Sequence, residues 1–275
     1  MQIGIIAGAG ELPLVIAQDA RSRGYRVVTA ALEHLASPDL EALSDRFRWI
    51  SVGKLGALID YLKAEQVTEA IMAGKVPKAL LFKAKIVPDM RAVKLLFSMK
   101  DRTDDGILRA LTGELQREGI RIVDTAAFSP DLLMPSGVIT RNRPSQDEWK
   151  DILFGWTIAK GIGSMDIGQT VVVKGKAVMA VEAIEGTDEA ILRGGSYANG
   201  GAIVVKVSKP HQDMRLDVPA IGLMTLETMI RAGARVLALE AGKSIIIDRQ
   251  KMIARADEAG ITMVGITPEV LEGIG

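Results

Sequence analysis

The segment KPHQDMRLDVPAIG, at residues 209–222, gathers carboxylates, cations, a histidine and a glutamine between two prolines. Each proline lacks a backbone donor and fixes its own φ, so we expect a loop here and neither a helix nor a strand. Asp213 and Asp217 offer the carboxylate oxygens that Mg²⁺ prefers, and Lys209 and Arg215 could neutralise phosphate charge. This combination of side chains suits metal-assisted phosphoryl chemistry.

A strand-like run, AIVVKV at 202–207, leads into this loop, and a helical pattern follows it from Leu223. The loop is therefore predicted to be held at both ends, at Pro210 and Pro219. Held charges are useful because catalysis by preorganised charge is lost when the groups move by small distances.

Glu182 is a second candidate, within the run VMAVEAIE. Its neighbours at a spacing of two, Val178, Ala180 and Ile184, are apolar, so a strand would place the carboxylate on an apolar face. A buried lone charge is costly, so Glu182 needs a metal ion, a base or a hydrogen-bond donor. A structural ion pair is the alternative to a ligand role.

The tetrapeptide EGTD follows at residues 185–188. Thr187 is predicted to be the N-cap of a helix, with Asp188 in the first turn, where the positive end of the helix dipole favours an acid. Both residues could serve the helix alone or also meet a ligand.

In the first half, AGAGELP at residues 7–13 follows a strand pattern. Gly8 and Gly10 would let a ligand approach the backbone, and the helix that begins near Leu12 would favour an anion at its N-terminus. A tight turn without a ligand is the alternative. The dinucleotide fingerprint G-x-G-x-x-G is incomplete because Pro13 stands where its third glycine belongs, but Glu33 keeps a nicotinamide-dependent oxidoreductase open.

Lys75, in MAGKVPK at residues 72–78, lies in another loop after a strand. It could reach a phosphate, and a solvated surface lysine is the equally simple interpretation. Asp104 and Asp105 are interpreted as helix-capping acids at the start of a helix at 104–118.

The first half alternates strand and helix, with strands expected at 3–8, 26–32, 47–52, 69–74 and 120–124. This alternation predicts a parallel sheet with helices on its faces, and ligands bind beyond the carboxyl ends of such strands. The periodicity lapses from 126 to 148, which we interpret as a linker. The second half then shows two strands, at 170–174 and 177–186, joined by Gly175-Lys176 as a hairpin.

We therefore predict an α/β protein of two domains with a boundary near 130–135. Residues 1–132 would form a Rossmann-like domain on the nucleotide side. Residues 133–275 would form a mixed α/β catalytic domain, with the ligand held between the two.

Composition narrows the function class. The 275 residues are 48% apolar and 25% charged, so the chain is globular, and the equal counts of 34 acidic and 34 basic residues give no case for nucleic acid as a partner. The chain has no cysteine, hence no disulfide or thiolate metal site. No uncharged apolar run approaches the ~18 to 20 residues of a membrane span. We expect a cytoplasmic protein, with weak peripheral contact at the inner membrane.

Four stretches together resemble one protein family. They are IGIIAGAGELP, AGKVPK, DIGQTVVVKGKAVMAVEAIEGTDEAI and GGAIVVKVSKPHQDMRLDVPAIGLMTLETM. The chain is similar along essentially its whole length to the UDP-2,3-diacylglucosamine pyrophosphatases of bacteria that lack the calcineurin-like enzyme for the same step. The second-half motifs show no departure from that family's pattern.

The resemblance implies a function in lipid A biosynthesis. The pyrophosphate of UDP-2,3-diacylglucosamine would be hydrolysed to UMP and 2,3-diacylglucosamine 1-phosphate (lipid X), with Mg²⁺ or another divalent cation. Asp217 best matches an aspartate that is essential in the family. The two histidines, His34 and His211, could not supply the ligands of a two-metal phosphoesterase.

These observations give one assignment of roles, and they leave the number of subunits open, a homo-oligomer included. Asp217, Asp213, Lys209 and Arg215 would be catalytic, and Asp217, Asp213 and Glu182 would hold the metal ion. The residues expected to bind substrate are Gly8, Gly10, Leu12, Lys75, Thr187, Asp188 and Gln212.

The alternatives are a non-catalytic protein that binds nucleotide sugars or lipids, and a nicotinamide-dependent oxidoreductase. The acidic loop favours hydrolysis, because acids without a metal repel a diphosphate. A substrate with two acyl chains would also need an apolar lining, and 4% aromatic residues predict one made mostly of Leu, Ile, Val, Met and Ala.

Overall fold

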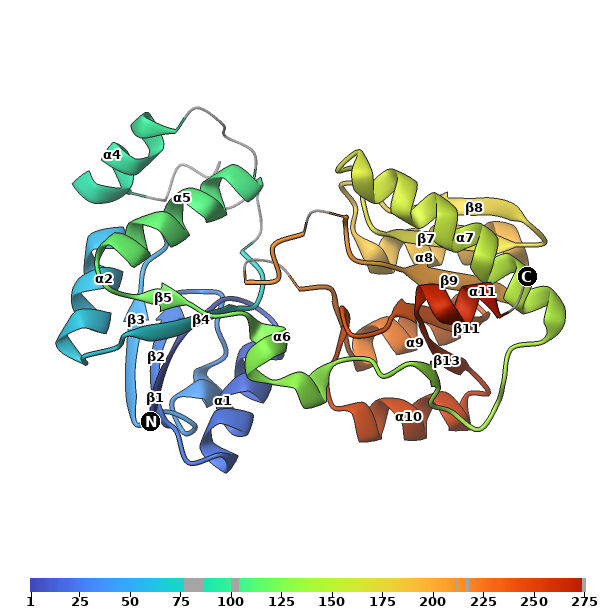
Figure 1. Cartoon of the computed structure of the whole chain (residues 1–275), viewed down its shortest axis with the longest axis horizontal. Coiled ribbons are helices and arrows are strands. Elements are labelled where there is room, and N and C mark those ends of the chain that lie inside the picture. Colours follow the sequence, from blue (N-terminus) through green and yellow to red (C-terminus); the bar gives the residue numbers. More distant parts are fainter. Residues whose placement is uncertain (77–86, 100–103, 211, 216–217, 274–275) are drawn as a thin grey trace. The chain divides into compact units, whose positions relative to one another are not determined.

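The computed structural model describes residues 1–76, 87–99, 104–210, 212–215 and 218–273. The chain divides into two compact units, Met1–Ser129 and Pro130–Gly275, and each is described by itself (Figure 1).

The first unit contains a five-stranded sheet in the order β3-β2-β1-β4-β5, and every pairing in it is parallel. This confirms the predicted Rossmann-like parallel sheet. The order reverses between β1 and β4, which is the point where ligands bind in open α/β sheets. The strands are β1 (Gln2–Ala7), β2 (Arg26–Leu32), β3 (Arg46–Ile50), β4 (Glu69–Ala73) and β5 (Arg121–Ile122).

Helices cover both faces of this sheet. Helices α2 and α5 bury Leu58, Leu62 and Leu115 against Ile6 and Val28, and α1 packs on β1, β2 and β4 from the other face. The helices of the unit are α1 (Leu12–Ser22), α2 (Leu55–Ala64), α4 (Met90–Ser98), α5 (Asp104–Arg117) and α6 (Thr125–Phe128), with a 3₁₀ turn at Pro38–Leu40.

The second unit contains a mixed six-stranded sheet in the order β6-β13-β11-β9-β7-β8, as predicted for a mixed α/β region. Strands β9, β11 and β13 are parallel, and β6, β7 and β8 run antiparallel to their neighbours. The strands are β6 (Gly137–Val138), β7 (Thr170–Lys174), β8 (Ala177–Val181), β9 (Ala202–Lys206), β11 (Ala234–Glu240) and β13 (Thr262–Ile266). A separate parallel pair joins β10 (Ala220–Ile221) to β12 (Ile245–Ile246).

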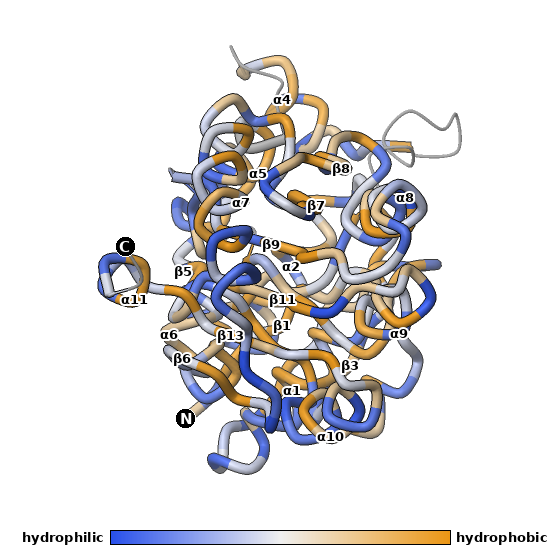
Figure 2. The backbone as a smooth tube through the Cα atoms, turned by 90° about the vertical axis from the view of Figure 1, so that its right-hand side faces the viewer, coloured by the Kyte–Doolittle hydropathy of each residue, from blue (hydrophilic) through white to orange (hydrophobic). Residues whose placement is uncertain are grey.

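The central strands of this sheet are buried on both faces, which explains their continuous apolar sequences (Figure 2). Val204 and Leu237 pack toward α8 and α9, and their chain neighbours Val205 and Ala238 pack toward α7. The helices of the unit are α7 (Gln146–Ser164), α8 (Thr187–Ala198), α9 (Leu223–Arg231), α10 (Arg249–Glu258) and α11 (Pro268–Glu272), with a 3₁₀ turn at Pro130–Leu132.

The predicted hairpin of β7 and β8 is present. Gly175 and Lys176 have φ angles of 57° and 56°, as the central residues of a type I′ turn require. The carboxylate of Asp151 on α7 accepts the backbone N–H groups of both residues, at 2.7 and 2.6 Å. A helix side chain therefore fixes the turn.

The stretch from 126 to 148 is more than the linker that its sequence predicts. Val138 pairs with Val264 in an antiparallel edge strand, β6. This strand has two residues, too few to produce a periodic pattern, and its place is set by the partner strand. Gly265 is necessary there, since a Cβ atom would lie 1.8 Å from the Pro135 carbonyl oxygen.

Candidate active site

The charged loop at residues 209–222 follows β9, and Ser208, the residue just before the loop, is held from both sides. The Ser208 N–H donates to the Glu240 carboxylate at 2.8 Å, and Lys160 donates to the Ser208 carbonyl oxygen at 3.0 Å. Lys160 and Lys243 also pair with Glu240, at 2.5 and 3.0 Å. The start of the loop is therefore tied to the end of β11 and to α7.

Further hydrogen bonds hold both ends of the loop. The Gln212 Oε1 atom accepts the Lys209 N–H at 2.9 Å and the Ser208 hydroxyl at 3.1 Å. At the far end, the Ile245 N–H donates to the Pro219 carbonyl oxygen at 2.7 Å, beside the β10–β12 pair. The predicted attachment at both ends is thus made by hydrogen bonds. His211, Leu216 and Asp217 lie outside the described residues.

The described charges of the loop are paired with one another or with a neighbour. Arg215 donates from Nε and Nη2 to the Asp213 carboxylate, at 2.9 and 2.6 Å. Lys209 forms an ion pair with Asp166, beyond the C-terminus of α7. Both cations are partly exposed, so each could exchange its carboxylate for a phosphate oxygen.

A buried polar network lies beside the loop, at the end of β9 and the start of α8. Lys206, which is 4% exposed, donates to the Thr187 hydroxyl at 2.7 Å. Thr187 in turn donates to the Glu182 Oε1 atom at 2.8 Å, and the Gln169 N–H lies 3.4 Å from Oε2. The structure thus brings together Glu182 and Thr187, which the sequence singled out, and adds Lys206, which it did not.

The Glu182 carboxylate is charged in this network. Burial alone would raise the pKa of Glu182, but the Lys206 ammonium, the hydroxyls of Thr170 and Thr187 and the Gln169 N–H hold the pKa below its usual value. The expectation of an apolar face around Glu182 was wrong. Strand β8 ends at Val181, and both Val178 and Ile184 are exposed.

The expected N-cap role of Thr187 was also wrong. Gly186 is the N-cap of α8, with a φ of 87° that a threonine rarely adopts, and Thr187 is the first helical residue. Its hydroxyl is engaged by Glu182 and Lys206 instead. Asp188 does lie in the first turn, and its Oδ1 atom is buried with no hydrogen bond to any described residue.

The described residues do not assemble the predicted magnesium site. No three histidine or acidic side chains among them gather in a way that could hold a metal ion. Glu182 is linked to Lys206 through the Thr187 hydroxyl. Asp213 forms a direct ion pair with Arg215. Asp217, the third predicted ligand, lies outside the described residues.

In the first unit, the loops after β1 and β4 meet at the reversal of strand order. Ala9 and Lys75 exchange two backbone hydrogen bonds, of 2.9 and 2.8 Å. Gly8 is required for this contact, because a Cβ atom there would lie 2.7 Å from the Lys75 carbonyl oxygen. Gly10, with a φ of 99°, faces open space, and Leu12 opens α1, whose N-cap makes no side-chain hydrogen bond.

The amino-acid sequence matches two family models in succession. Residues 2–132 match the LpxI N-terminal domain and residues 135–264 match the LpxI C-terminal domain. The chain belongs to the LpxI family. A relative from Caulobacter vibrioides, named UDP-2,3-diacylglucosamine pyrophosphatase LpxI, is 31% identical over 282 residues and covers 98% of both chains.

Other similarities are partial. The bifunctional purine biosynthesis protein PurH of Anaeromyxobacter species is 28% identical over 132 residues, which cover 46% of this chain and 22% of that protein. The crystal structure of gox2253 covers 96% of this chain and 77% of its own, at 11% identity and a TM-score of 0.33. None of the described helices is long and apolar enough to cross a bilayer.

The LpxI C-terminal match contains the charged loop, Glu182, Lys206 and Glu240. A groove of about 350 Å³ also lies in this region, lined by Leu153, Phe154 and Ile158 with Lys150 and Lys176. The groove lies at the hairpin end of β7, whereas Thr170 and the buried network lie at the other end of that strand. It is therefore separate from the candidate active site.

We expect Glu240→Ala to lower the free energy of unfolding by about 3 kcal/mol at neutral pH, because it strips a half-buried Lys160 of its partner and the Ser208 N–H of its acceptor. Denaturant unfolding of this LpxI protein measures the effect. Glu240→Gln is the matched control, since it keeps an acceptor for Ser208. Equal stability of Glu240→Ala and the unmodified chain would contradict the anchoring role.

The loss of stability caused by Glu240→Ala should become smaller in acid. Burial raises the pKa of Glu240, but Lys160, Lys243 and the Ser208 N–H outweigh burial and hold it below the ordinary 4.5. A lowered folded-state pKa contributes stability above the unfolded-state pKa and loses it as the pH falls through the folded-state value. The difference between Glu240→Ala and the unmodified chain should therefore shrink below pH 4.5.

Proposed function

We propose that this protein hydrolyses the pyrophosphate bond of UDP-2,3-diacylglucosamine in lipid A biosynthesis, giving UMP and lipid X. The observation that carries the proposal is the match to the named LpxI relative, at 31% identity over 98% of both chains. The reaction is cytoplasmic in this proposal, and the substrate is met at the inner membrane.

The substrate carries a diphosphate, and the described part of the second unit offers cations for it. In our proposal Lys209 and Arg215 leave Asp166 and Asp213 to contact phosphate oxygens. Lys206 stays in place and supplies a fixed positive charge, which acts more strongly in a water-poor site than in bulk water. Glu182 and Thr187 are positioning residues for Lys206, because their hydrogen bonds fix its ammonium group.

The chemical step is attack by water on phosphorus. A new P–O bond forms, the bond from that phosphorus to the bridging oxygen breaks, and the bridging oxygen leaves with the other phosphate. Asp217, or Asp213 once Arg215 has moved to phosphate, would orient the water and take its proton. Gln212 holds the turn that presents these residues.

The uridine half is assigned to the first unit. Support comes from Gly10, which faces open space, from the N-terminus of α1 at Leu12, and from the exposed Lys75 tied to the same loop. Helix N-termini favour anions.

In the second unit, Asp188 has a buried oxygen that lacks a described partner, and this oxygen would accept a hydrogen bond from the substrate. That the substrate is held between the two units remains a prediction.

The dependence on a divalent cation also remains a prediction. We expect turnover to be lost in EDTA and restored by excess Mg²⁺. The described side chains do not identify the ligands, so no step above passes through a metal ion. Full turnover in EDTA, with metal content below one equivalent by elemental analysis, would overturn this prediction.

Incubation of the purified protein with UDP-2,3-diacylglucosamine tests the function. Equal amounts of UMP and lipid X should appear, and ¹⁸O-labelled water should place its oxygen on the phosphate that was attacked. Binding without turnover would favour a nucleotide-sugar or lipid-binding protein. Oxidation of a substrate with reduction of a nicotinamide cofactor would favour the oxidoreductase.

A further inference from the structure

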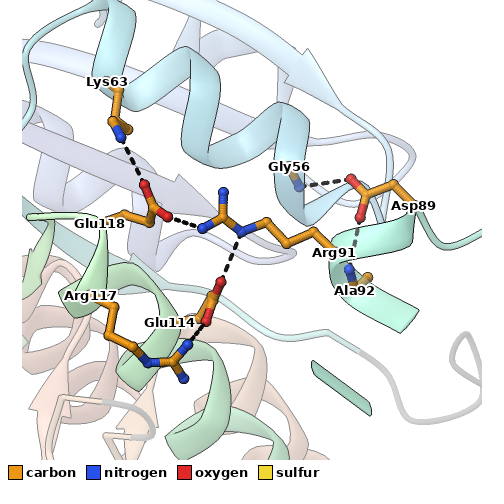
Figure 3. A network of polar contacts seen from close by, with 8 residues as sticks. All are labelled: Gly56, Lys63, Asp89, Arg91, Ala92, Glu114, Arg117 and Glu118. Carbon is orange, nitrogen blue, oxygen red and sulfur yellow. Dashed lines mark hydrogen bonds and ion pairs between the residues drawn. The ribbon is translucent and has the colours of Figure 1, made fainter. Parts of the chain in front are cut away.

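Helix α4 in the first unit is held to its neighbours by polar contacts (Figure 3). The Asp89 carboxylate caps the helix by accepting the Ala92 N–H at 2.8 Å, and it also accepts the Gly56 N–H of α2 at 2.7 Å. Arg91 forms ion pairs with Glu114 and Glu118 of the α5 region. The inward-facing side of α4 thus combines these polar contacts with the buried Ala92 and with Leu95, which packs against the core.

These contacts shift the pKa values of the groups that make them. The hydrogen bonds that Arg91 donates to Glu114 and Glu118 outweigh burial and raise the pKa of Arg91, and hydrogen bonds from Lys63 and Arg91 lower the pKa of Glu118. Arg117 also pairs with Glu114 (Figure 3). Among the residues that the structure describes here, Asp89, Glu114 and Glu118 are thus engaged on the inner side of α4.

The outer side of α4 is apolar. Met90 is 71% exposed and Phe97 is 80% exposed, and Val87, just before the helix, is 67% exposed. Met90, Lys94 and Phe97 lie at positions i, i+4 and i+7, so they share one face of the helix. Lys94 is exposed, and no described acid forms an ion pair with it.

A usual surface helix buries its apolar residues and exposes charged ones. Helix α4 buries Ala92 and packs Leu95 inward, yet it also exposes large apolar side chains on its outer face. Clustered exposed apolar side chains mark interaction sites. A face with Phe and Met beside an exposed Lys matches helices that lie in the plane of a membrane, where the apolar groups enter the acyl region and the lysine reaches anionic headgroups.

We propose that Val87, Met90, Lys94 and Phe97 form a docking surface for an anionic phospholipid bilayer. The proposal rests on the function proposed above, because a diacylated substrate must be taken from a membrane. Lys94 supplies charge complementarity to the anionic headgroups. Of the described acids near the helix, Asp89, Glu114 and Glu118 are engaged by groups on its inner side and so do not oppose the contact.

Co-sedimentation of the purified full chain with vesicles tests the docking surface without substrate. We expect binding to phosphatidylglycerol-containing vesicles and little binding to pure phosphatidylcholine. Met90→Ser combined with Phe97→Ser should weaken binding at least about tenfold, because two apolar anchors are lost. Lys94→Gln should weaken binding about fivefold on anionic vesicles alone.

Tyr197→Ser combined with Met224→Ser is the matched control. It removes an aromatic side chain and a methionine of similar exposure, 71% and 72%, from the second unit. It should bind vesicles like the unmodified chain. Circular dichroism and thermal unfolding check that both double variants are folded.

A turnover assay separates this proposal from the proposed function. The α4 double variant should hydrolyse detergent-dispersed substrate normally and vesicle-embedded substrate several times more slowly. If the unmodified chain turned over neither form, the function would fail, and the vesicle-binding result would still decide the docking surface. Equal binding by the α4 variant and the unmodified chain would overturn the proposal. So would a concentration-dependent dimer that only this variant loses, since a second copy would then cover the face.

Discussion

Asp217→Asn should lower turnover by at least about a hundredfold while folding and substrate binding persist, as expected for loss of a catalytic acid or base. The substitution keeps the side-chain shape and one acceptor oxygen but removes the charge. Asp217 lies outside the described residues, yet the ends of its loop are fixed by Glu240, Gln212 and the β10–β12 pair. These contacts do not depend on the Asp217 carboxylate, so the loop should keep its ends in the variant.

Steady-state kinetics and the identity of co-purified lipid measure this effect. Substrate should accumulate on the variant, and product should accumulate on the unmodified chain. An exposed structural acid would change stability by only about 0.5 kcal/mol and leave turnover intact. Near-normal turnover of Asp217→Asn or Asp217→Ala with Mg²⁺ present would move the assignment to Asp213, Asp188 or Glu182.

Lys206→Met should lower turnover by about a hundredfold, the typical effect of removing one preorganised group that stabilises transition-state charge. The substitution also leaves Glu182 as a buried carboxylate that has lost its cation, so stability should fall by about 3 kcal/mol. Stability and catalysis are therefore both affected, and a second variant is needed to separate them.

The combination of Lys206→Met with Glu182→Gln separates the two effects. Without the buried carboxylate charge, stability should return close to that of the unmodified chain, because replacing both members of a buried pair is often neutral. Turnover should stay low, because the positive charge is still absent. If turnover returned together with stability, Lys206 would be a purely structural residue.

The parallel sheet, the mixed second sheet and the hairpin could be predicted because each depends on local sequence. Strand and helix alternate at regular spacing in the first half, and Gly175-Lys176 suits a two-residue turn. Strand β6 could not be predicted in this way, since its pairing with β13 comes from residues more than a hundred positions away.

The candidate site could be predicted in part. Glu182 was recognised because a carboxylate in an apolar run needs a partner, but the sequence could not name that partner. Lys206 ends a strand and appears in its sequence as one polar residue among valines. Its role depends on Thr187 and Glu182, which come from the adjoining α8 and from the end of β8. The exposed apolar side chains of α4 could not be predicted from the sequence. Periodicity shows that the faces of a helix differ, but it does not show which side chains are buried.

The paired backbone of Ala9 and Lys75 bears on the entropic cost of binding an anion in the first unit. The two loops are joined by reciprocal hydrogen bonds, so they form one stiff support and not two independent arms. A phosphate bound near Gly10, as proposed above, would meet a lysine whose backbone is already in place. Only the Lys75 side chain must then be ordered, so the entropic cost of capture falls on one side chain and spares the main chain.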